Sequence, residues 1–205
     1  MSISENSARL RALIVAAGLS SRMGTLKALL PVAGEAMIRL SAKKLLAAGA
    51  EEIVVVTGYR REAIEAALTG LPARFVLNEN YASTQMFDSI KLGLAALKDS
   101  EQIFFAPVDA PAYRTETARA LLRFRSDFAV PCFERKPGHP ILMTAKAARW
   151  LCGYSGEGGL RAAMQTIGLP IHELETDDPG VLLDADTPEE YKKMLQTLQR
   201  SGNGG

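Results

Sequence analysis

The residues best suited to chemistry lie in one short segment near the N-terminus. Gly18, Arg22 and Lys27 follow the apolar run 12–16, which predicts a buried strand leading into a glycine-containing loop. The backbone amides of such a loop can point at phosphate oxygens, because small residues let a ligand approach closely. A guanidinium fork and a mobile ammonium add positive charge. The set suits a nucleoside triphosphate, although a tight strand-to-helix loop with solvated basic residues explains the same pattern.

Carboxylates stand at two further points where strands are expected to end. Asp109 follows the apolar run 102–107, and Mg²⁺ binds through one or two carboxylates plus substrate phosphates. The alternative is an aspartate that caps a turn beside proline. Asp184 and Asp186 share one face of the last expected strand. Asp184 is the candidate second metal ligand beside Asp109.

The spacing of the glycines excludes two common nucleotide-binding loops. The GxxxxGK[ST] pattern is absent, and Gly18 and Gly24 are six positions apart, which does not fit GxGxxG. A nicotinamide-binding Rossmann domain is therefore disfavoured.

Strand and helix patterns alternate along the whole chain and must position these residues. Strands are expected at 12–16, 53–57, 73–77, 102–107, 127–133, 139–143, 171–175 and 181–184, and helices at 36–49, 60–68, 85–97, 115–125, 144–152, 157–167 and 187–198. Strands that are apolar on both faces predict an α/β fold, a Rossmann-like three-layer α/β/α sandwich with a mostly parallel sheet. Ligands bind such sheets beyond the carboxyl ends of the strands. We expect one domain over 1–205 with loose tails at 1–9 and 200–205, and the pair 127–133 and 139–143 forms either a hairpin or a crossover.

Composition narrows the class of protein. The 205 residues carry 24 Lys plus Arg against 23 Asp plus Glu, a net charge of +1, so no basic excess favours nucleic-acid binding. No apolar run is long enough for a membrane span, and no signal pattern opens the chain. Two cysteines and two histidines argue against a disulfide framework or a zinc site. The default location is the cytoplasm.

The string AAGLSSRMGTLK resembles the signature of the molybdenum cofactor nucleotidyltransferases, the MobA-like NTP transferase family. The resemblance implies the fold of nucleotide-diphospho-sugar transferases. It implies that the triphosphate is held by Arg22 and Lys27, which act with Asp109 in catalysis, and that the loop binds the nucleotide through Ala16, Ala17, Gly18, Leu19, Ser20 and Ser21. The triplet Ala16-Ala17-Gly18 is typical of the cytidylyl-transferring branch and favours CTP. At Val108-Asp109-Ala110-Pro111 the chain keeps the Asp and Pro of that branch and departs from it at the other two positions.

Four further segments carry candidate site residues, and three of them resemble motifs of the family. Asn78 and Ser89 belong to a stretch that lines the nucleotide pocket in relatives, although Ser89 also fits a helix surface. His139, in a match to R-x-x-G-H-P, is a candidate for the acceptor or a structural histidine. Gly158, Gly159 and Arg161 open a helix that can bind an anion, or form a solvated loop. In the closing segment Thr187 to Glu190 predicts a capping box, and Asp186 either helps that cap or binds the acceptor.

The resemblance implies transfer of a nucleotide from an NTP, CTP being favoured, to a phosphate of molybdopterin or its metal-loaded form. Pyrophosphate leaves, Mg²⁺ assists, and the product passes to a molybdoenzyme. Alternatives are transfer to a sugar phosphate or another small phosphate acceptor, and a non-catalytic cofactor-binding chaperone on the same fold.

Overall fold

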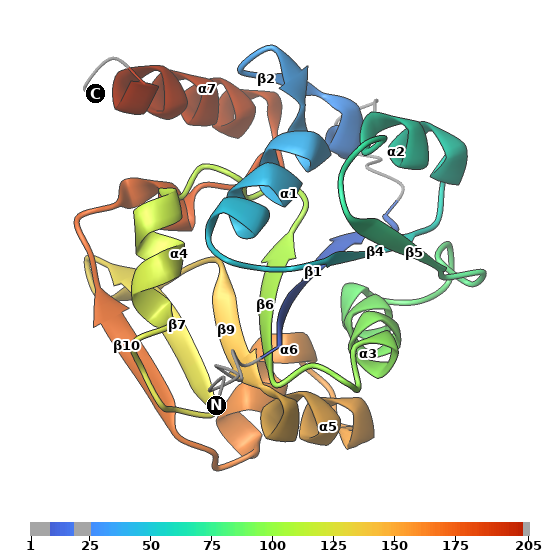
Figure 1. The fold of residues 1–205 in the computed structure, drawn as a ribbon, viewed down its shortest axis with the longest axis vertical. Helices are drawn as coiled ribbons and strands as arrows, with labels where there is room; N and C mark the ends of the chain where they lie inside the picture. The colour runs from blue at the N-terminus through green and yellow to red at the C-terminus, as the bar shows by residue number, and fades with distance from the viewer. Residues whose placement is uncertain (1–8, 19–25, 203–205) are drawn as a thin grey trace, which may run out of the picture.

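A mostly parallel sheet runs through the middle of the molecule in the computed structural model, which describes residues 9–18 and 26–202 (Figure 1). Its strands are β1 (Leu10–Ala16), β4 (Ile53–Thr57), β5 (Ala73–Leu77), β6 (Gln102–Pro107), β7 (Phe128–Phe133), β8 (Lys136–Pro137), β9 (Ile141–Thr144) and β10 (Ile171–Glu175). The helices are α1 (Met37–Ala47), α2 (Arg61–Ala67), α3 (Met86–Ala96), α4 (Thr115–Leu121), α5 (Ala145–Gly153), α6 (Gly159–Thr166) and α7 (Pro188–Gly202). Two 3-10 turns, η2 (Lys27–Leu29) and η3 (Pro179–Leu182), and a small hairpin of β2 (Pro31–Val32) with β3 (Glu35–Ala36) complete the described elements.

The strand order explains how the ends of β1 and β6 meet. The strands lie in the order β10-β7-β9-β6-β1-β4-β5, and β8 pairs with β7. β9 is antiparallel to both of its neighbours, while β1 pairs in parallel with β4 and β6. The two runs 127–133 and 139–143 are therefore antiparallel neighbours, with Phe128 opposite Met143. Val15 lies opposite Pro107, so β1 and β6 end side by side.

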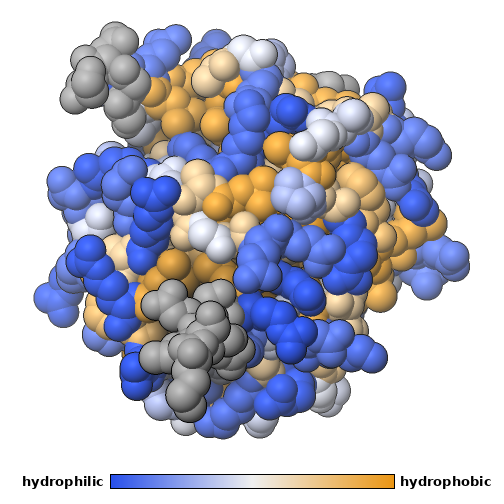
Figure 2. All heavy atoms as spheres, viewed as in Figure 1, coloured by the Kyte–Doolittle hydropathy of each residue, from blue (hydrophilic) through white to orange (hydrophobic). Residues whose placement is uncertain are grey.

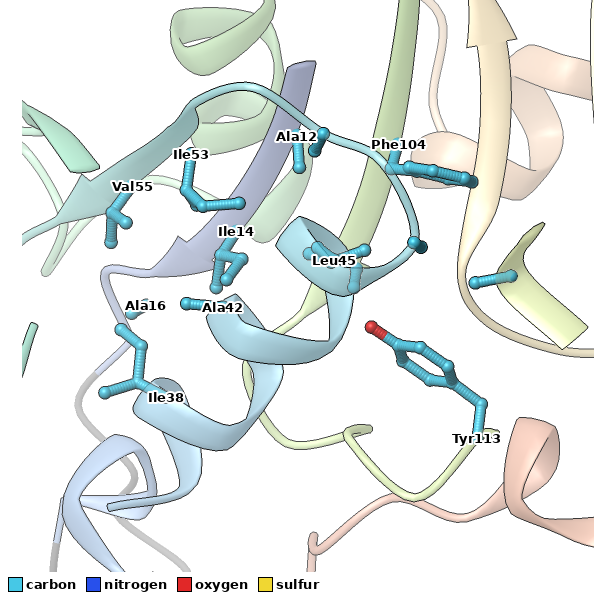
Figure 3. Close-up of a cluster of buried hydrophobic side chains, with 14 of the residues drawn as sticks. Ala12, Ile14, Ala16, Ile38, Ala42, Leu45, Ile53, Val55, Phe104 and Tyr113 are labelled. Atoms are coloured by element: carbon cyan, nitrogen blue, oxygen red, sulfur yellow. The ribbon is translucent and has the colours of Figure 1, made fainter. Parts of the chain in front are cut away.

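Helices cover both faces of the sheet, which confirms the expected α/β/α sandwich. Apolar side chains of α1, α2 and α4 pack on one face with Ala12 and Ile14 of β1. Those of α3, α5 and α6 pack on the other face with Leu13 and Val15. Figure 3 shows the first of these clusters, in which Leu45 of α1 lies against the sheet. The alternation along β1 explains why this strand reads as a continuous apolar run.

The strand expected at 181–184 is wrong. The chain forms the 3-10 turn η3 there and then continues without regular structure to α7. Proline at the first position of η3 and the carboxylate of Asp178, which accepts from Gly180 N at 3.0 Å, favour the turn. The backbone then crosses the ends of neighbouring strands: His139 N donates to Val181 O and Ala185 N donates to Asp109 O. This segment therefore brings its side chains to the end of β6 without joining the sheet.

The last helix begins at the predicted capping box. Thr187 N donates to Glu190 Oε2 at 2.9 Å, and Glu190 N donates to Thr187 Oγ1 at 3.2 Å. The helix continues beyond the expected position 198 to Gly202. Because Thr187 and Glu190 cap the helix, Asp186 remains available for other contacts.

None of the helices in the described part of the chain is long and apolar enough to cross a membrane. The face seen in Figure 2 carries hydrophilic side chains in many places, with apolar surface exposed between them.

Candidate active site

A pocket of about 180 Å³ lies at the carboxyl ends of β1 and β6. Five segments contribute to it: the end of β1, η2, the start of α3 with the loop before it, the end of β6 and the segment before α7. A single residue, Asp186, comes from the segment before α7. The lining residues are Val15, Ala16, Ala17, Gly18, Leu26, Lys27, Ala28, Tyr81, Thr84, Gln85, Met86, Ser89, Pro107, Val108, Asp109 and Asp186.

One ammonium group joins two carboxylates in this pocket. Lys27 Nζ lies 3.0 Å from Asp109 Oδ2 and also donates to Asp186 Oδ1. Only 12% of the Lys27 side chain and 13% of the Asp109 side chain are exposed. Burial alone lowers the pKa of Lys27, but the hydrogen bond and charge of Asp186, together with those of Asp109, raise it above the usual value. The lysine is therefore charged at neutral pH.

Of the two aspartates in the closing segment, Asp186 lines the pocket and Asp184 does not. The two residues were expected on one strand face, but no strand forms, and only Asp186 lines the pocket. Asp184 is exposed, and its pKa is raised by partial burial and then by the charges of Asp109, Asp186 and Glu190. It therefore lies in the field of the carboxylate pair.

The carboxylates fit a divalent cation that also binds phosphate. Within residues 9–18 and 26–202 no three Asp, Glu, His or Cys side chains gather as a complete metal centre. However, Mg²⁺ needs only one or two carboxylates when substrate phosphates supply other ligands. Asp109 and Asp186 already share one cation, the ammonium of Lys27. They are the donor set that suits a metal bound together with a nucleotide.

The nucleotide-binding residues expected in the first loop are described only in part. Ala16, Ala17 and Gly18 line the pocket, whereas Leu19, Ser20, Ser21 and Arg22 lie outside the described residues. The pattern alone did not single out Gly58, the residue after β4. A Cβ there would come within 2.6 Å of Tyr81 and 2.7 Å of Ala17 O, so glycine permits this close approach.

Asn78 and Ser89 differ in their position. Asn78 is buried, and its Nδ2 donates to Thr84 Oγ1 and to Ser89 Oγ, each at 2.9 Å. Its Oδ1 accepts from Asn80 N at 3.0 Å. Ser89 reaches the pocket wall and Asn78 does not. Asn78 therefore supports the pocket from behind, whereas Thr84 and Ser89 line it.

The expected acceptor residues are not all brought together. Burial lowers the pKa of His139 to about 4, against the opposing charge of Asp109, and its ring meets that of Phe105 edge to face. Its Nδ1 is buried and makes no hydrogen bond in the described part of the chain. Gly158, Gly159 and Arg161 stand at the start of α6 and do not line the pocket.

Comparison with known proteins places this site in a family. The family model of the MobA-like NTP transferase domain matches residues 12–198. The molybdenum cofactor cytidylyltransferase of Escherichia coli is 30% identical over 87% of this chain and 92% of its own length. The nicotine blue oxidoreductase of Paenarthrobacter nicotinovorans is 29% identical over 89% and 94%.

Solved structures agree with the fold. A nucleotidyl transferase from Methanothermobacter is similar with a TM-score of 0.83 and 26% identity, over 94% of this chain and 99% of that one. Rv0371c of Mycobacterium tuberculosis, solved in complex with manganese, is similar in fold with a TM-score of 0.74 and 22% identity, over 92% and 98%. The family model matches residues 12–198, nearly the whole chain, and this match shows that the protein belongs to the MobA-like NTP transferase family and is a nucleotidyltransferase.

Proposed function

We propose that this nucleotidyltransferase moves a cytidylyl group from CTP to a phosphate of molybdopterin or its metal-loaded form, releasing pyrophosphate. The observation that carries the proposal is the contact of Lys27 with Asp109 and Asp186 in a pocket at the ends of β1 and β6. The choice of CTP and molybdopterin is supported by the similarity to the cytidylyltransferase of Escherichia coli and by the Ala16-Ala17-Gly18 triplet.

The reaction needs positioning and charge neutralisation. An oxygen of the acceptor phosphate attacks the α-phosphorus, a new P–O bond forms, and the bond to the leaving pyrophosphate breaks. Lys27 and Arg22 bind the negative charge that gathers on the leaving group, and the backbone at Ala17 and Gly18 faces the phosphates. Asp109 and Asp186 would hold Mg²⁺, with Asp184 nearby. When bound, the ion neutralises phosphate charge.

Binding of the nucleotide changes the partners of Lys27. Its ammonium is held by two carboxylates in the structure described here. A triphosphate offers the lysine new anionic partners, and a divalent cation offers Asp109 and Asp186 a stronger charge than one ammonium. The lysine and the carboxylates are therefore expected to separate when nucleotide and metal bind together.

The residues that we propose for contact with the acceptor come from two places in the fold. Burial lowers the pKa of His139 and the charge of Asp109 acts against that effect, so His139 is a candidate within the electrostatic reach of Asp109. Gly158, Gly159 and Arg161 at the start of α6 remain candidates for an anionic group of the acceptor.

The test is the release of pyrophosphate by the full chain with Mg²⁺, each of CTP, GTP, ATP and UTP, and molybdopterin. We expect release with CTP only when molybdopterin is present, and a cytidine dinucleotide by mass spectrometry. Release with GTP instead would overturn the base assignment, and release with a sugar phosphate would overturn the acceptor. No release with any pair would favour a cofactor-binding chaperone.

A further inference from the structure

A second lysine is partly buried beneath the segment that carries Asp109. Lys44 of α1 points its ammonium at two backbone carbonyls, Pro111 O at 2.8 Å and Tyr113 O at 2.7 Å. The same nitrogen lies 5.4 Å from the centre of the Tyr113 ring, a cation–π distance. Lys44 does not line the pocket. It therefore contacts the backbone that follows Asp109 and leaves the nucleotide site itself untouched.

The segment 109–114 is held on its other side by η3 and the chain after it. Asp178 is 2% exposed and accepts from Arg114 N at 2.6 Å and from Thr117 Oγ1 at 2.8 Å. Ala185 N donates to Asp109 O at 3.0 Å. A positively charged group on α1 and a negatively charged group before η3 thus bind successive backbone groups of one short segment.

We propose that Lys44 is a positioning residue for nucleotidyl transfer, fixing the 109–113 backbone so that Asp109 faces the metal and the triphosphate. The segment has no sheet partner of its own after β6 ends at Pro107. Its carbonyls at 111 and 113 instead take their hydrogen bonds from one side chain. Loss of that side chain leaves two carbonyls to be satisfied by water or by movement of the segment.

The cost of burying the charged ammonium of Lys44 supports a positioning role. Burial lowers its pKa to about 8, although the charges of Asp178 and Glu116 act in the opposite direction. Tyr113, whose hydroxyl points toward α1 in Figure 3, is fully buried and its pKa is raised by burial. An apolar residue on α1 would fill this space without desolvating a charge. The ammonium is therefore explained by the backbone it binds.

The experiment compares Lys44→Met, Lys44→Arg and Lys43→Met with wild type. Lys43, next on the same helix, is exposed and pairs only with Glu35 among the described residues, so it is a matched control. Calorimetry gives the Kd of CTP with and without Mg²⁺, and steady-state assays give kcat and KM, all well below each variant's melting temperature. The inference rests on the proposed function, in which Asp109 holds the metal, but any NTP that wild type binds serves as the probe.

We expect Lys44→Met to bind metal-free CTP as wild type does, to lose most of the tightening caused by Mg²⁺, and to lower kcat about tenfold or more. Lys44→Arg, which keeps the charge and the donors, should recover part of both. Equal metal tightening and kcat in folded Lys44→Met and Lys43→Met would overturn the inference, as would parallel losses with metal-free nucleotide. If Lys44→Met does not fold, Lys44→Gln repeats the test. Failure of wild type to bind any NTP contradicts the proposed function instead.

Discussion

Lys27 contacts both carboxylates of the pocket, so it stands between the two functions that the proposed reaction requires there, the binding of phosphate and the binding of a metal. The lysine stays charged because Asp186 and Asp109 raise its pKa despite burial. It also reduces the repulsion between two carboxylates that face the same space. One ammonium between two carboxylates leaves a net negative charge, which is the charge that the proposed divalent cation requires.

We expect the three aspartates of this region to differ in their effect on turnover. Asp109→Asn should lower kcat about 100-fold or more, since it removes a group that neutralises charge in the reaction. Asp186→Asn should lower kcat and raise the Mg²⁺ concentration needed for half the maximal rate. Asp184→Asn should change both kcat and the Mg²⁺ requirement less than Asp186→Asn does, because Asp184 is exposed and does not line the pocket.

Steady-state release of pyrophosphate over a range of Mg²⁺ concentrations measures all three variants. Asp99→Asn, an exposed residue outside the pocket, is the control. An unchanged rate for Asp109→Asn would remove Asp109 from the mechanism. A stronger metal effect for Asp184→Asn than for Asp186→Asn would return the second ligand position to Asp184.

The free energy of unfolding that Lys44 contributes should depend on pH. The pKa of Lys44 is lowered by burial to about 8 in the folded protein and is near its ordinary value of 10.5 in the unfolded chain. Between those values the unfolded state binds more protons, so the free energy of unfolding contributed by Lys44 rises with pH. Below pH 8 both states are protonated and the contribution is constant.

Urea unfolding of wild type and Lys44→Met at pH 7 and pH 10 measures this contribution as a difference, which cancels the other titrating groups. From pH 7 to pH 10 we expect the free energy of unfolding of wild type to rise relative to that of the variant by at most about 3 kcal/mol, at about 1.4 kcal/mol per pKa unit. A difference that does not change, or that shrinks toward pH 10, contradicts the lowered pKa.

At the scale of elements, the turn between β7 and β8 carries backbone strain. Glu134 and Arg135 have φ of 50° and 62°, and Phe133 pairs with Lys136 across the turn. Positive φ at both central residues is the requirement of a type I′ turn, which favours Asn-Gly. The pair Glu134→Asn with Arg135→Gly should therefore stabilise the fold by about 1 kcal/mol.

Thermal and urea unfolding measure this gain, which should raise the melting temperature by about 3 °C in a domain of this size. Glu134→Ala with Arg135→Ala removes the same charges but keeps the strained conformation, so it should bring no gain. A gain in both double variants would assign the effect to charge.

The elements that the sequence predicted best are those with a strong, local pattern. The run IVVVT at 53–57 and the run 102–107 are strands with the expected bounds, because buried parallel strands are apolar on both faces. The failure at 181–184 has a specific cause. Val181 and Leu182 are apolar because they pack beside the Asp109 segment, and a proline with Asp178 favours a 3-10 turn.

The same failure explains which part of the site was predictable. Lys27 and Asp109 follow strands that the pattern placed correctly, so their meeting followed from the expected sheet. Which of the two aspartates, Asp184 or Asp186, lines the pocket depends on the path of an irregular segment, and hydrophobic periodicity does not predict that path. No sequence motif pointed to Lys44, because its partners are backbone carbonyls that are distant in sequence.

At the scale of the whole molecule, ligand binding should appear as stability. A nucleotide that binds only the folded chain, at about 100 times its dissociation constant, stabilises it by about 2.7 kcal/mol. For a domain of this size that raises the melting temperature by about 5–10 °C. We expect the shift with CTP and Mg²⁺, and smaller shifts with GTP, ATP and UTP.

Thermal unfolding of wild type, Lys27→Met and Lys43→Met with each nucleotide separates the site from general effects. Lys27→Met should lose most of the CTP shift, because the variant lacks the ammonium that binds the phosphates. Lys43→Met should keep the shift. A shift with GTP alone would mean that the Ala16-Ala17-Gly18 triplet does not select the base, and the family assignment would stand. An equal shift in both variants would place the nucleotide elsewhere, because a pocket that binds triphosphate through Lys27 must lose affinity when that charge is removed.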